Sequence, residues 1–516
     1  MLISHTQTQP HADAATASRS SLAPRVGRGS WWGRRLRSPL QRVAALTLAA
    51  GGLSASLGAS SASGAPLSGW STAADAPAAA AGAGELASVK IPVEKWTLDN
   101  GLTVLLSPDR SLPVVAVEVR YLVGSSYEAK GKSGFAHLFE HLMFQGSEHF
   151  NHEYFAPFEP IGAAVNGTTN TDRTNYYERV PSQYLELALW MESDRMFGLL
   201  PVLDQAKLDN QRDVVKNERR QSYENQPYGM FYAYLAEAIY PPGHPYRHLT
   251  IGSHDDLTKA SLQDVRDFFK QYYNPANAVL TLVGDFEPAQ TKRLIQRYFN
   301  TPKTGKRAAA VSAKPVELTG IKHLKYTDAV AAPRVYFAWS TPALYADGDA
   351  ALDVLASVLS DGKTSRLYKP LVFDKKLAKD VSAYQMSSQL GSVFVVQATA
   401  ADKKTSADQL AKDLLATLRS ALAKPPTADE LQRSLNGWKK SFFGRVEGVL
   451  GRAQLLSSYY HLAGDADYLL KDLERYTSVG APDVEAAGKL LSLEDYVRID
   501  ITPGPKPEVS DSMGGM

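Results

Sequence analysis

Cysteine is absent from this 516-residue sequence, which excludes disulfide bonds and thiolate chemistry. Any metal ion must therefore be bound by His, Asp or Glu side chains. Long apolar runs are scarce as well. The run VAALTLAAGGLSASLGA is short and diluted by Gly and Ser, which argues against a stable transmembrane helix. Otherwise the composition, 44% hydrophobic and 21% charged, is that of a globular protein.

A large charge of one sign is also lacking, since 56 basic and 54 acidic residues give a net charge of +2. Seven Arg and one acid, Asp13, lie in residues 1–74, which leaves 49 basic and 53 acidic residues in the remainder. This slightly acidic remainder gives no reason to expect nucleic-acid binding. The length favours two to four domains.

The N-terminal region has the composition of a targeting segment. Its Arg-rich stretch precedes the apolar run and small residues, so we interpret residues 1–65 as a signal or leader segment. Residues 66–88, rich in Ala, Gly and Ser, are interpreted as a flexible linker. These features predict export to the periplasm or secretion. A mitochondrial transit peptide is the alternative, because the region is rich in Arg and Ser and poor in acids.

The remainder of the chain contains two copies of one pattern. The segment PRVYFAWSTPALYADGDAALDVLASVLSDG resembles VVAVEVRYLVGSSYEAKGKSGFAHLFEHLMFQG, and EDYVRIDITPGPKP resembles NAVLTLVGDFEP. Such self-similarity predicts an α+β fold of two homologous α/β sandwich domains, each an antiparallel-rich sheet packed with helices. We expect an N-terminal domain over 89–300, a linker over 301–315 and a C-terminal domain over 316–510.

Two histidines and a glutamate lie within five positions of GFAHLFEHLMFQG, residues 134–146. On a helix, His137 and His141 project from one face and can reach a single ion. Glu140 lies beside such an ion, where its carboxylate suits a general base that takes a proton from water. The order H-x-x-E-H is the inverse of the H-E-x-x-H motif. Polar groups on an amphipathic helix are the alternative, but the intervening residues are apolar.

The second copy lacks this motif. Aligning Gly146 with Gly362 gives an offset of 216, which places Asp353, Ala356 and Ser357 opposite the two histidines and the glutamate. Metal ligands would be lost together in this way, because one ligand is useless alone. The repeat therefore favours a metal site in the first copy.

A catalytic zinc site usually has a third protein ligand, which should lie downstream. The segment LDNQRDVVKNERRQSYENQPYG, which begins at Leu208, offers Glu218 on a predicted helix. Asp213 and Glu224 are rivals in the same segment, and the residues alone do not choose among the three.

The segments GFAHLFEHLMFQG, RDVVKNERRQ and YYNPANAVLTLVGDFEP resemble the pitrilysin/insulinase family of zinc peptidases over about residues 90–510. The resemblance implies half of a clamshell, a peptide substrate and one zinc ion per chain. Family members place a glutamate 77 positions after the second histidine, which here is Glu218. His137, His141 and Glu218 are thus the implied ligands, with Glu140 as base.

Further residues are assigned by the same resemblance. Many members carry a supporting glutamate where this chain has Gln211, whose amide can still hydrogen-bond. Asn166 and Gly167 occupy a strand that in relatives pairs with an extended peptide. A plain structural strand is the alternative.

The second domain of the family normally supplies an Arg and a Tyr that stabilise charge in the transition state. Here those positions are Val372 and Lys379. We therefore expect a heterodimer in which a homologous, zinc-less partner supplies the pair. A homodimer with substitutes such as Lys379 is an alternative. Two further readings are a mitochondrial presequence-processing subunit and a non-catalytic core or scaffold subunit.

Overall fold

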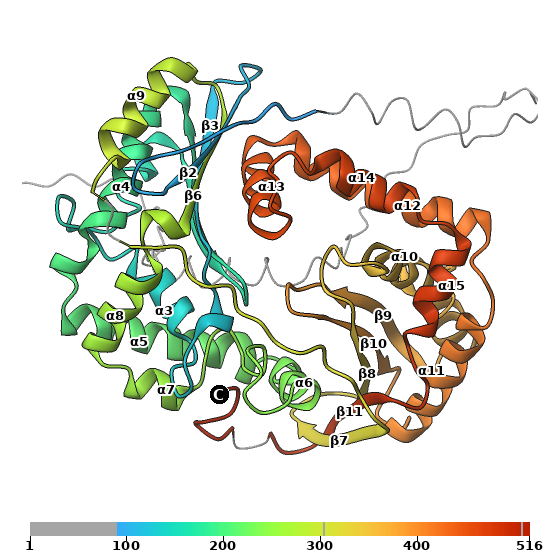
Figure 1. Ribbon diagram of the computed structural model, residues 1–516. Coiled ribbons are helices and arrows are strands. Elements are labelled where there is room, and N and C mark those ends of the chain that lie inside the picture. The colour runs from blue at the N-terminus through green and yellow to red at the C-terminus, as the bar shows by residue number, and fades with distance from the viewer. Residues whose placement is uncertain (1–89, 303–304, 507–508, 516) are drawn as a thin grey trace, which may run out of the picture.

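The computed structural model of the protein describes residues 90–302, 305–506 and 509–515 (Figure 1). The predicted leader, 1–65, and the predicted linker, 66–88, lie outside these residues. None of the helices in the described ranges combines the length and apolarity that a membrane crossing requires.

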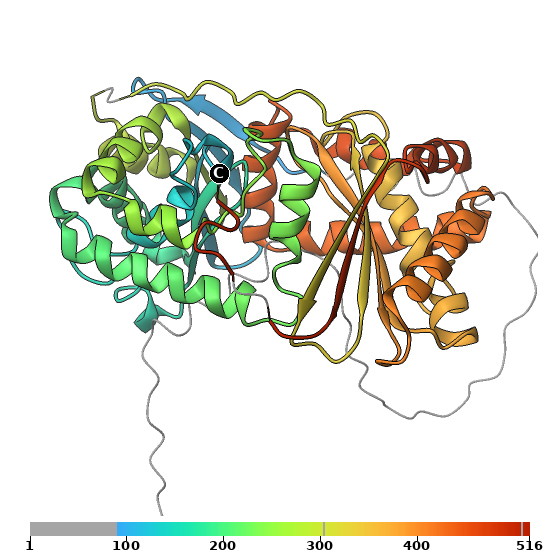
Figure 2. The same ribbon diagram turned by 90° about the horizontal axis from the view of Figure 1, so that it is seen from below.

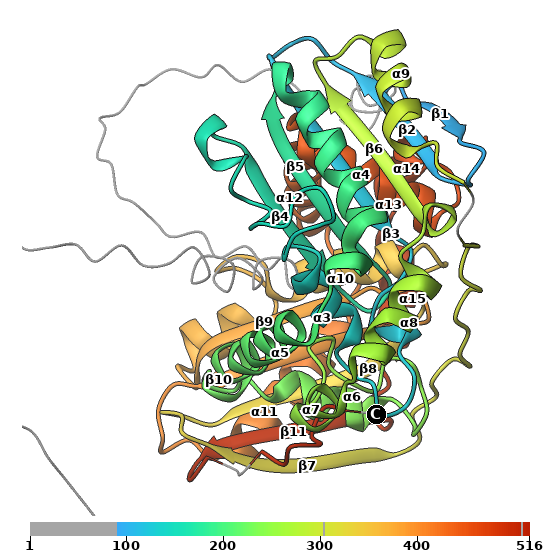
Figure 3. The ribbon, with the colours of Figure 1, turned by 90° about the vertical axis from the view of Figure 1, so that its left-hand side faces the viewer.

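The first half of the chain forms a six-stranded sheet in the order β1-β2-β6-β3-β5-β4. Neighbouring strands are antiparallel except β2 and β6, which are parallel. β6 is buried along its whole length, and β4 is an edge strand (Figure 3). The strands are β1 (Glu94–Thr97), β2 (Thr103–Pro108), β3 (Val114–Tyr121), β4 (Ala164–Thr169), β5 (Thr174–Pro181) and β6 (Ala278–Gly284).

The second sheet repeats this order without a counterpart of β1. Its five strands run β7-β11-β8-β10-β9, and the pair β7–β11 is again parallel. The shared order confirms the predicted α+β fold of two homologous, antiparallel-rich units, although the sequence did not predict the two parallel pairs. The strands are β7 (Ile321–Asp328), β8 (Arg334–Thr341), β9 (Ala378–Met386), β10 (Ser392–Ala400) and β11 (Tyr496–Pro503).

Helices cover the faces of both sheets (Figures 1 and 2). Those of the first half are α3 (Phe135–Leu142), α4 (Leu185–Val202), α5 (Gln205–Arg219), α6 (Phe231–Ile239), α7 (His254–Lys259), α8 (Leu262–Tyr272) and α9 (Pro288–Phe299). Those of the second half are α10 (Asp349–Ser360), α11 (Ala407–Leu422), α12 (Ala428–Glu447), α13 (Val449–Leu462), α14 (Leu469–Thr477) and α15 (Ala481–Lys489).

The two halves exchange one helix each. α13, from the second half, packs on β3 and β6 of the first sheet, on the face opposite α3. α6, from the first half, packs on β8 and β11 of the second sheet. Because β8 and β11 stand where β3 and β6 stand in the first sheet, the exchange is reciprocal. Each exchanged helix is separated in sequence from the sheet it covers by the predicted linker, 301–315, so the cores of the two halves are interlocked.

A buried polar network fixes α13 on the first sheet. Glu118 of β3 is fully buried and accepts hydrogen bonds from Ser457 of α13 and Asn175 of β5, both at 2.7 Å. Arg120 donates to Ser457 at 3.0 Å and pairs with Glu118 at 3.4 Å. A buried carboxylate is tolerated when its charge and its hydrogen bonds are satisfied. The position of α13 on the sheet is thereby specified.

The interlocked cores predict that a defect in α13 destabilises the whole protein. Leu456 of α13 is 1% exposed and packs in the core shared with the first sheet. Leu456→Ala should lower the free energy of unfolding by about 2–4 kcal/mol, while calorimetry still records one transition. The matched control is Leu470→Ala, because Leu470 is 37% exposed. Two separate unfolding transitions, of which only one shifts in temperature, would contradict the interlocking of the two cores.

Candidate metal centre

The predicted metal-binding motif lies on α3, all eight residues of which are buried. The helix follows Gly134, whose φ of 90° is costly for other residues; a Cβ there would also lie 2.7 Å from the Ile251 carbonyl oxygen. The side chain of Glu128 accepts hydrogen bonds from the backbone N–H groups of Gly134 at 2.9 Å and Ala136 at 2.7 Å. A carboxylate at a helix N-terminus satisfies exposed N–H groups and complements the helix dipole.

Glu128 is itself held by His248, whose Nε2 lies 2.8 Å from the carboxylate. Burial raises the pKa of Glu128, and the hydrogen bond from His248 opposes this shift. The sequence analysis did not find this pair. His248 lies far from the motif in sequence, and no spacing connects it to Glu128.

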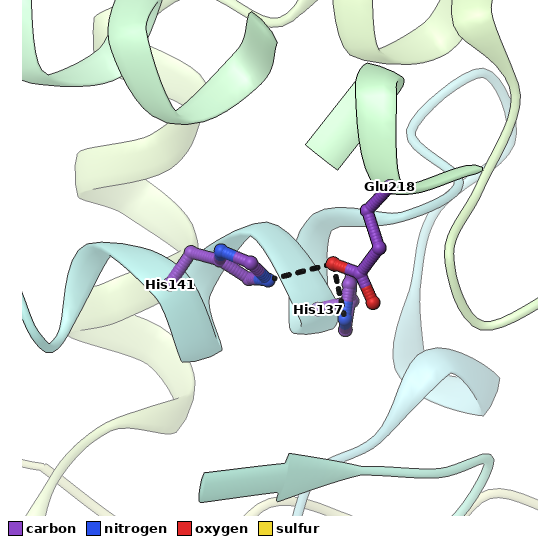
Figure 4. Close-up of side chains that lie close together, drawn as sticks. All are labelled: His137, His141 and Glu218. Atoms are coloured by element: carbon purple, nitrogen blue, oxygen red, sulfur yellow. Dashed lines mark ion pairs between the residues drawn. The ribbon is translucent and has the colours of Figure 1, made fainter. Parts of the chain in front are cut away.

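His137, His141 and Glu218 come together in the structure (Figure 4). Oε2 of Glu218 lies 3.8 Å from Nε2 of His137 and 3.2 Å from Nε2 of His141. Glu218 comes from α5, so two helices supply the cluster. All three residues are buried, with at most 7% of each exposed.

The electrostatics of the cluster suit a cation. Burial lowers the pKa of His137, although the charge of Glu218 opposes this shift. Burial acts on His141 in the same direction, but the hydrogen bond and the charge of Glu218 outweigh it, so the pKa of His141 is raised. A buried carboxylate and two imidazoles that differ in proton affinity can all be satisfied by one divalent ion.

The geometry of the cluster also fits a metal ion. One ligand atom from each residue lies within 4.8 Å of the others. Tetrahedral ligands at zinc-to-nitrogen distances lie about 3.3 Å apart, so small side-chain adjustments suffice. Within the described part of the chain, this is the one group of His, Asp and Glu with such an arrangement.

The rival third ligands lie elsewhere. Asp213 is exposed on α5. Glu224 accepts hydrogen bonds from Arg219 at 2.8 Å and pairs with His254 at 2.7 Å, so its carboxylate is already engaged. Gln211 is buried beside the cluster, and its hydrogen bond adds to the rise in the pKa of His141. The structure thus brings Glu218, and neither rival, to the two histidines.

Glu140 lies beside the cluster and is held by the edge strand β4. Thr169 donates a hydrogen bond from Oγ1 to Oε2 of Glu140 at 2.6 Å. Gly167 of the same strand packs closely on Glu140, because a Cβ at this glycine would lie 3.1 Å from Cγ of Glu140. Thr169 was missed by the sequence analysis. Its place two residues after Gly167, on the same face of the strand, was the available signal.

The strand residues Asn166 and Gly167 lie in β4, which has no strand of the described chain on its outer side (Figure 3). The Asn166 side chain accepts a hydrogen bond from the backbone N–H of Gly167 at 2.9 Å. Asn166 pairs with Tyr177 of β5, so its side chain shares a face with Tyr177 and points away from Glu140. The two predicted residues therefore face opposite sides of the sheet.

The second half places α10 where the first half has α3. Both helices follow a glycine with positive φ, Gly134 at 90° and Gly348 at 87°. These glycines are 214 positions apart, two fewer than the offset predicted from the sequence. In this register the residues opposite the histidines and glutamate of the motif are apolar: Ala351, Val354 and Leu355.

Residues of other types occupy the positions at which a catalytic Arg and Tyr are expected. Val372 is partly buried against the second core, and Lys379 is exposed on β9. Arg366 binds the Glu430 carboxylate, with Nε at 2.8 Å and Nη2 at 2.6 Å, and also donates to backbone carbonyls. Its guanidinium is therefore committed to the helices of the second half.

Comparison with known proteins shows the family to which the chain is similar. Residues 103–245 match the family described as Insulinase (Peptidase family M16), and residues 259–437 match the Peptidase M16 inactive domain. Zinc protease PqqE of Helicobacter pylori is 30% identical over 412 residues, which cover 79% of this chain and 89% of that protein. Cytochrome b-c1 complex subunit 1, mitochondrial, of Rattus norvegicus is 24% identical over 434 residues, 78% of this chain and 87% of that protein.

A solved structure has the same fold. The crystal structure of a protease from Helicobacter pylori matches with a TM-score of 0.73 at 27% identity, covering 80% of this chain and 100% of that chain.

Removal of any member of the cluster should abolish stoichiometric metal binding. Changes to groups around a metal ligand cost about 10–100-fold in affinity, and loss of a ligand should cost at least as much. We expect His137→Ala, His141→Ala and Glu218→Gln to lose zinc in chelator competition. Asp213→Asn and Glu224→Gln are matched controls that should keep it. Zinc loss in a control and retention in Glu218→Gln would reverse the assignment.

The hydroxyl of Thr169 should position Glu140 without affecting the metal. Thr169→Val removes the hydrogen bond at nearly constant volume, so kcat should fall about tenfold at unchanged zinc content. Thr169→Ser keeps the hydroxyl and should keep most of the activity. Equal rates for the Val and Ser variants would show that this hydrogen bond is dispensable.

Proposed function

The chain belongs to peptidase family M16, the insulinase family, and from this membership and its metal-type cluster we propose that it is a zinc-dependent endopeptidase. Its substrates would be peptides or unfolded polypeptide segments. The observation that carries the proposal is the buried group of His137, His141 and Glu218 with Glu140 beside it. The name zinc protease in a relative supports the choice of metal.

His137, His141 and Glu218 would hold one zinc ion per chain and leave a fourth position open for water or substrate. When bound, the ion would polarise the scissile carbonyl and lower the pKa of the attacking water. The near-complete burial of the three ligands limits competing contacts with bulk water.

Glu140 would act as general base and then as general acid. The hydrogen bond from Thr169 occupies Oε2, which leaves Oε1 to take the proton of the attacking water. The water oxygen bonds to the carbonyl carbon, the C–N bond breaks, and Glu140 returns the proton to the departing amine. This sequence needs no other co-reactant.

The substrate would bind as an added strand along β4. An edge strand offers unpaired N–H and C=O groups, and backbone pairing tolerates many side-chain sequences. The strand carries both Thr169 and Gly167, which contact Glu140, so a peptide paired with β4 lies next to the base. Asn166 would then contact the alternate substrate side chains.

We further propose that the chain is the zinc-bearing member of a heterodimer. Val372 and Lys379 stand where an Arg and a Tyr are expected, so this chain would supply the metal ligands and the base but not the Arg/Tyr pair that stabilises the developing oxyanion. A homologous, zinc-less partner would supply them.

A second candidate is a non-catalytic core subunit, which the name of the cytochrome b-c1 relative favours. The complete ligand set with its base supports the peptidase instead. The composition of residues 1–65 supports export to the periplasm or secretion, and N-terminal sequencing of the mature protein distinguishes export from mitochondrial import.

Activity should be found in the native complex. The tagged chain, captured gently from its own host with its partner, should hydrolyse quenched peptides in a chelator-sensitive reaction. The Glu140→Gln variant should capture the same partner and bind zinc but lose about 10²–10⁴-fold in rate, as expected for a general base.

The lone zinc-loaded chain separates the two parts of the proposal. We expect it to be far slower than the complex. Full turnover by the lone chain would overturn the heterodimer and leave the peptidase intact. A zinc-loaded complex in which Glu140→Gln changes nothing would overturn the peptidase itself.

A further inference from the structure

The side chains of β4 divide between two faces. Gly167 and Thr169 point towards Glu140. Ala164, Asn166 and Thr168 pair with residues of β5 and face the opposite side, towards α13. Because strand side chains alternate, a peptide added to β4 would also direct every second side chain away from the metal. Those side chains would lie over this opposite face.

Two arginines occupy that face beside β4. Arg173 donates from Nη1 to the carbonyl of Thr168 at 2.7 Å and to its hydroxyl at 2.5 Å, so its guanidinium lies over β4 itself. Arg179 is exposed and pairs across the strands with Ala164. The short side chain of Ala164 leaves room for Arg179 to extend over β4 towards its open edge.

The spacing of the two arginines matches one side of a strand. They lie level with Thr168 and Ala164, which are four residues apart on β4. A paired peptide would therefore direct the side chains of its residues i and i+4 towards the two guanidinium groups. The side chain of residue i+2 would lie over Asn166 and its pair Tyr177.

The carboxylates near this face have other hydrogen-bond or ion-pair partners. Glu118 is fully buried and is already engaged by Asn175, Arg120 and Ser457. Glu178 points to the other face of β5, where it binds Arg195. Asp172, next to Arg173, accepts a hydrogen bond from Tyr246 and is buried.

The protonation of neighbouring groups is consistent with a positive potential. Burial lowers the pKa of Arg173 to about 10, so it remains charged at neutral pH. His461 of α13 is 9% exposed, and burial together with the charges of Arg120, Arg307 and Arg173 lowers its pKa to about 3. Burial is the larger cause of this shift, and the charges of the three arginines add to it.

We infer that Arg173 and Arg179 select substrates with acidic side chains at positions i and i+4, on the side of the peptide that faces away from the metal. The inference rests on the proposed pairing of peptides along β4 and names their charge. The same face disfavours Arg-rich segments such as mitochondrial presequences, because like charges would be brought together.

Binding of labelled peptides to the native complex that contains the zinc-loaded Glu140→Gln chain tests this without cleavage. A Thr/Val peptide carrying Glu at i and i+4 should bind about fivefold tighter than the same peptide with Gln, and Lys should bind more weakly than Gln. A peptide of identical composition with the two Glu residues adjacent directs their side chains to opposite faces. Relative to the Gln peptide, its increase in the logarithm of affinity should be about half that of the i and i+4 peptide. The preferences should weaken with added salt.

Charge variants identify the residues. Arg179→Gln should remove part of the preference for Glu over Gln, and Arg173→Gln with Arg179→Gln should remove most of it. Arg297→Gln on α9 is the matched control, because Arg297 is 69% exposed and lies on another surface. Arg173 is hydrogen-bonded to Thr168, so its loss could disturb β4. The single variant Arg179→Gln leaves that contact intact and still tests the charge preference.

The outcomes separate the inference from the proposed function. Equal binding of the Glu, Gln and Lys peptides would overturn the charge preference and leave pairing along β4 intact. An unchanged preference in the double variant would overturn the assignment to these arginines. Failure of every peptide to bind would overturn both pairing along β4 and the preference that rests on it.

Discussion

The carboxylate of Glu218 lies next to the imidazoles of His137 and His141 in a buried cluster from which water is largely excluded. The elements of the first half of the protein are arranged around this cluster. Such a group of ligands is unfavourable without a cation, because burial penalises each charge. The helices α3 and α5 must therefore be held in place by contacts other than those of the ligands. Interactions at the start of α3, along its side and in the neighbouring strand supply this support.

The short helix α3 connects every part of the candidate site. Its N-terminus is anchored by Glu128, it carries His137 and His141, and its Glu140 is bound by Thr169 of the edge strand. A change in the position of α3 would therefore move the two histidines and Glu140 together, relative to Glu218 on α5. The reciprocal exchange of α6 and α13 extends this support to the second half, whose α13 covers one face of the first sheet. Among the described residues, the group that could hold a metal lies in the first half.

The sequence predicted those features whose geometry follows from the spacing of residues alone. The four-residue separation of His137 and His141 fixes their common face on any helix, and the repeat predicted two similar units. Glu218 was different, since Asp213 and Glu224 had equal claims until the family resemblance chose among them. The packing of α5, which exposes Asp213 and buries Glu218, makes the same choice physically.

Other features depend on contacts between distant segments and left no signal in the sequence. The pairing of Glu128 with His248 joins residues 120 positions apart. The exchange of α6 and α13 was equally hidden, because an apolar helix face does not specify which sheet it will cover. The predicted repeat offset of 216 aligns the glycines that follow the two helices, whereas the glycines that precede them are 214 positions apart. The two offsets differ because α10 is longer than α3.

The account is tested most directly by locating the metal. A crystal of the zinc-loaded chain, measured at the zinc absorption edge, should show one anomalous peak about 2.0–2.2 Å from Nε2 of His137, Nε2 of His141 and the carboxylate of Glu218. Glu140 should lie close by without binding the ion. A peak elsewhere, no peak at this cluster, or a site in which Glu140 replaces Glu218 as ligand would contradict the account.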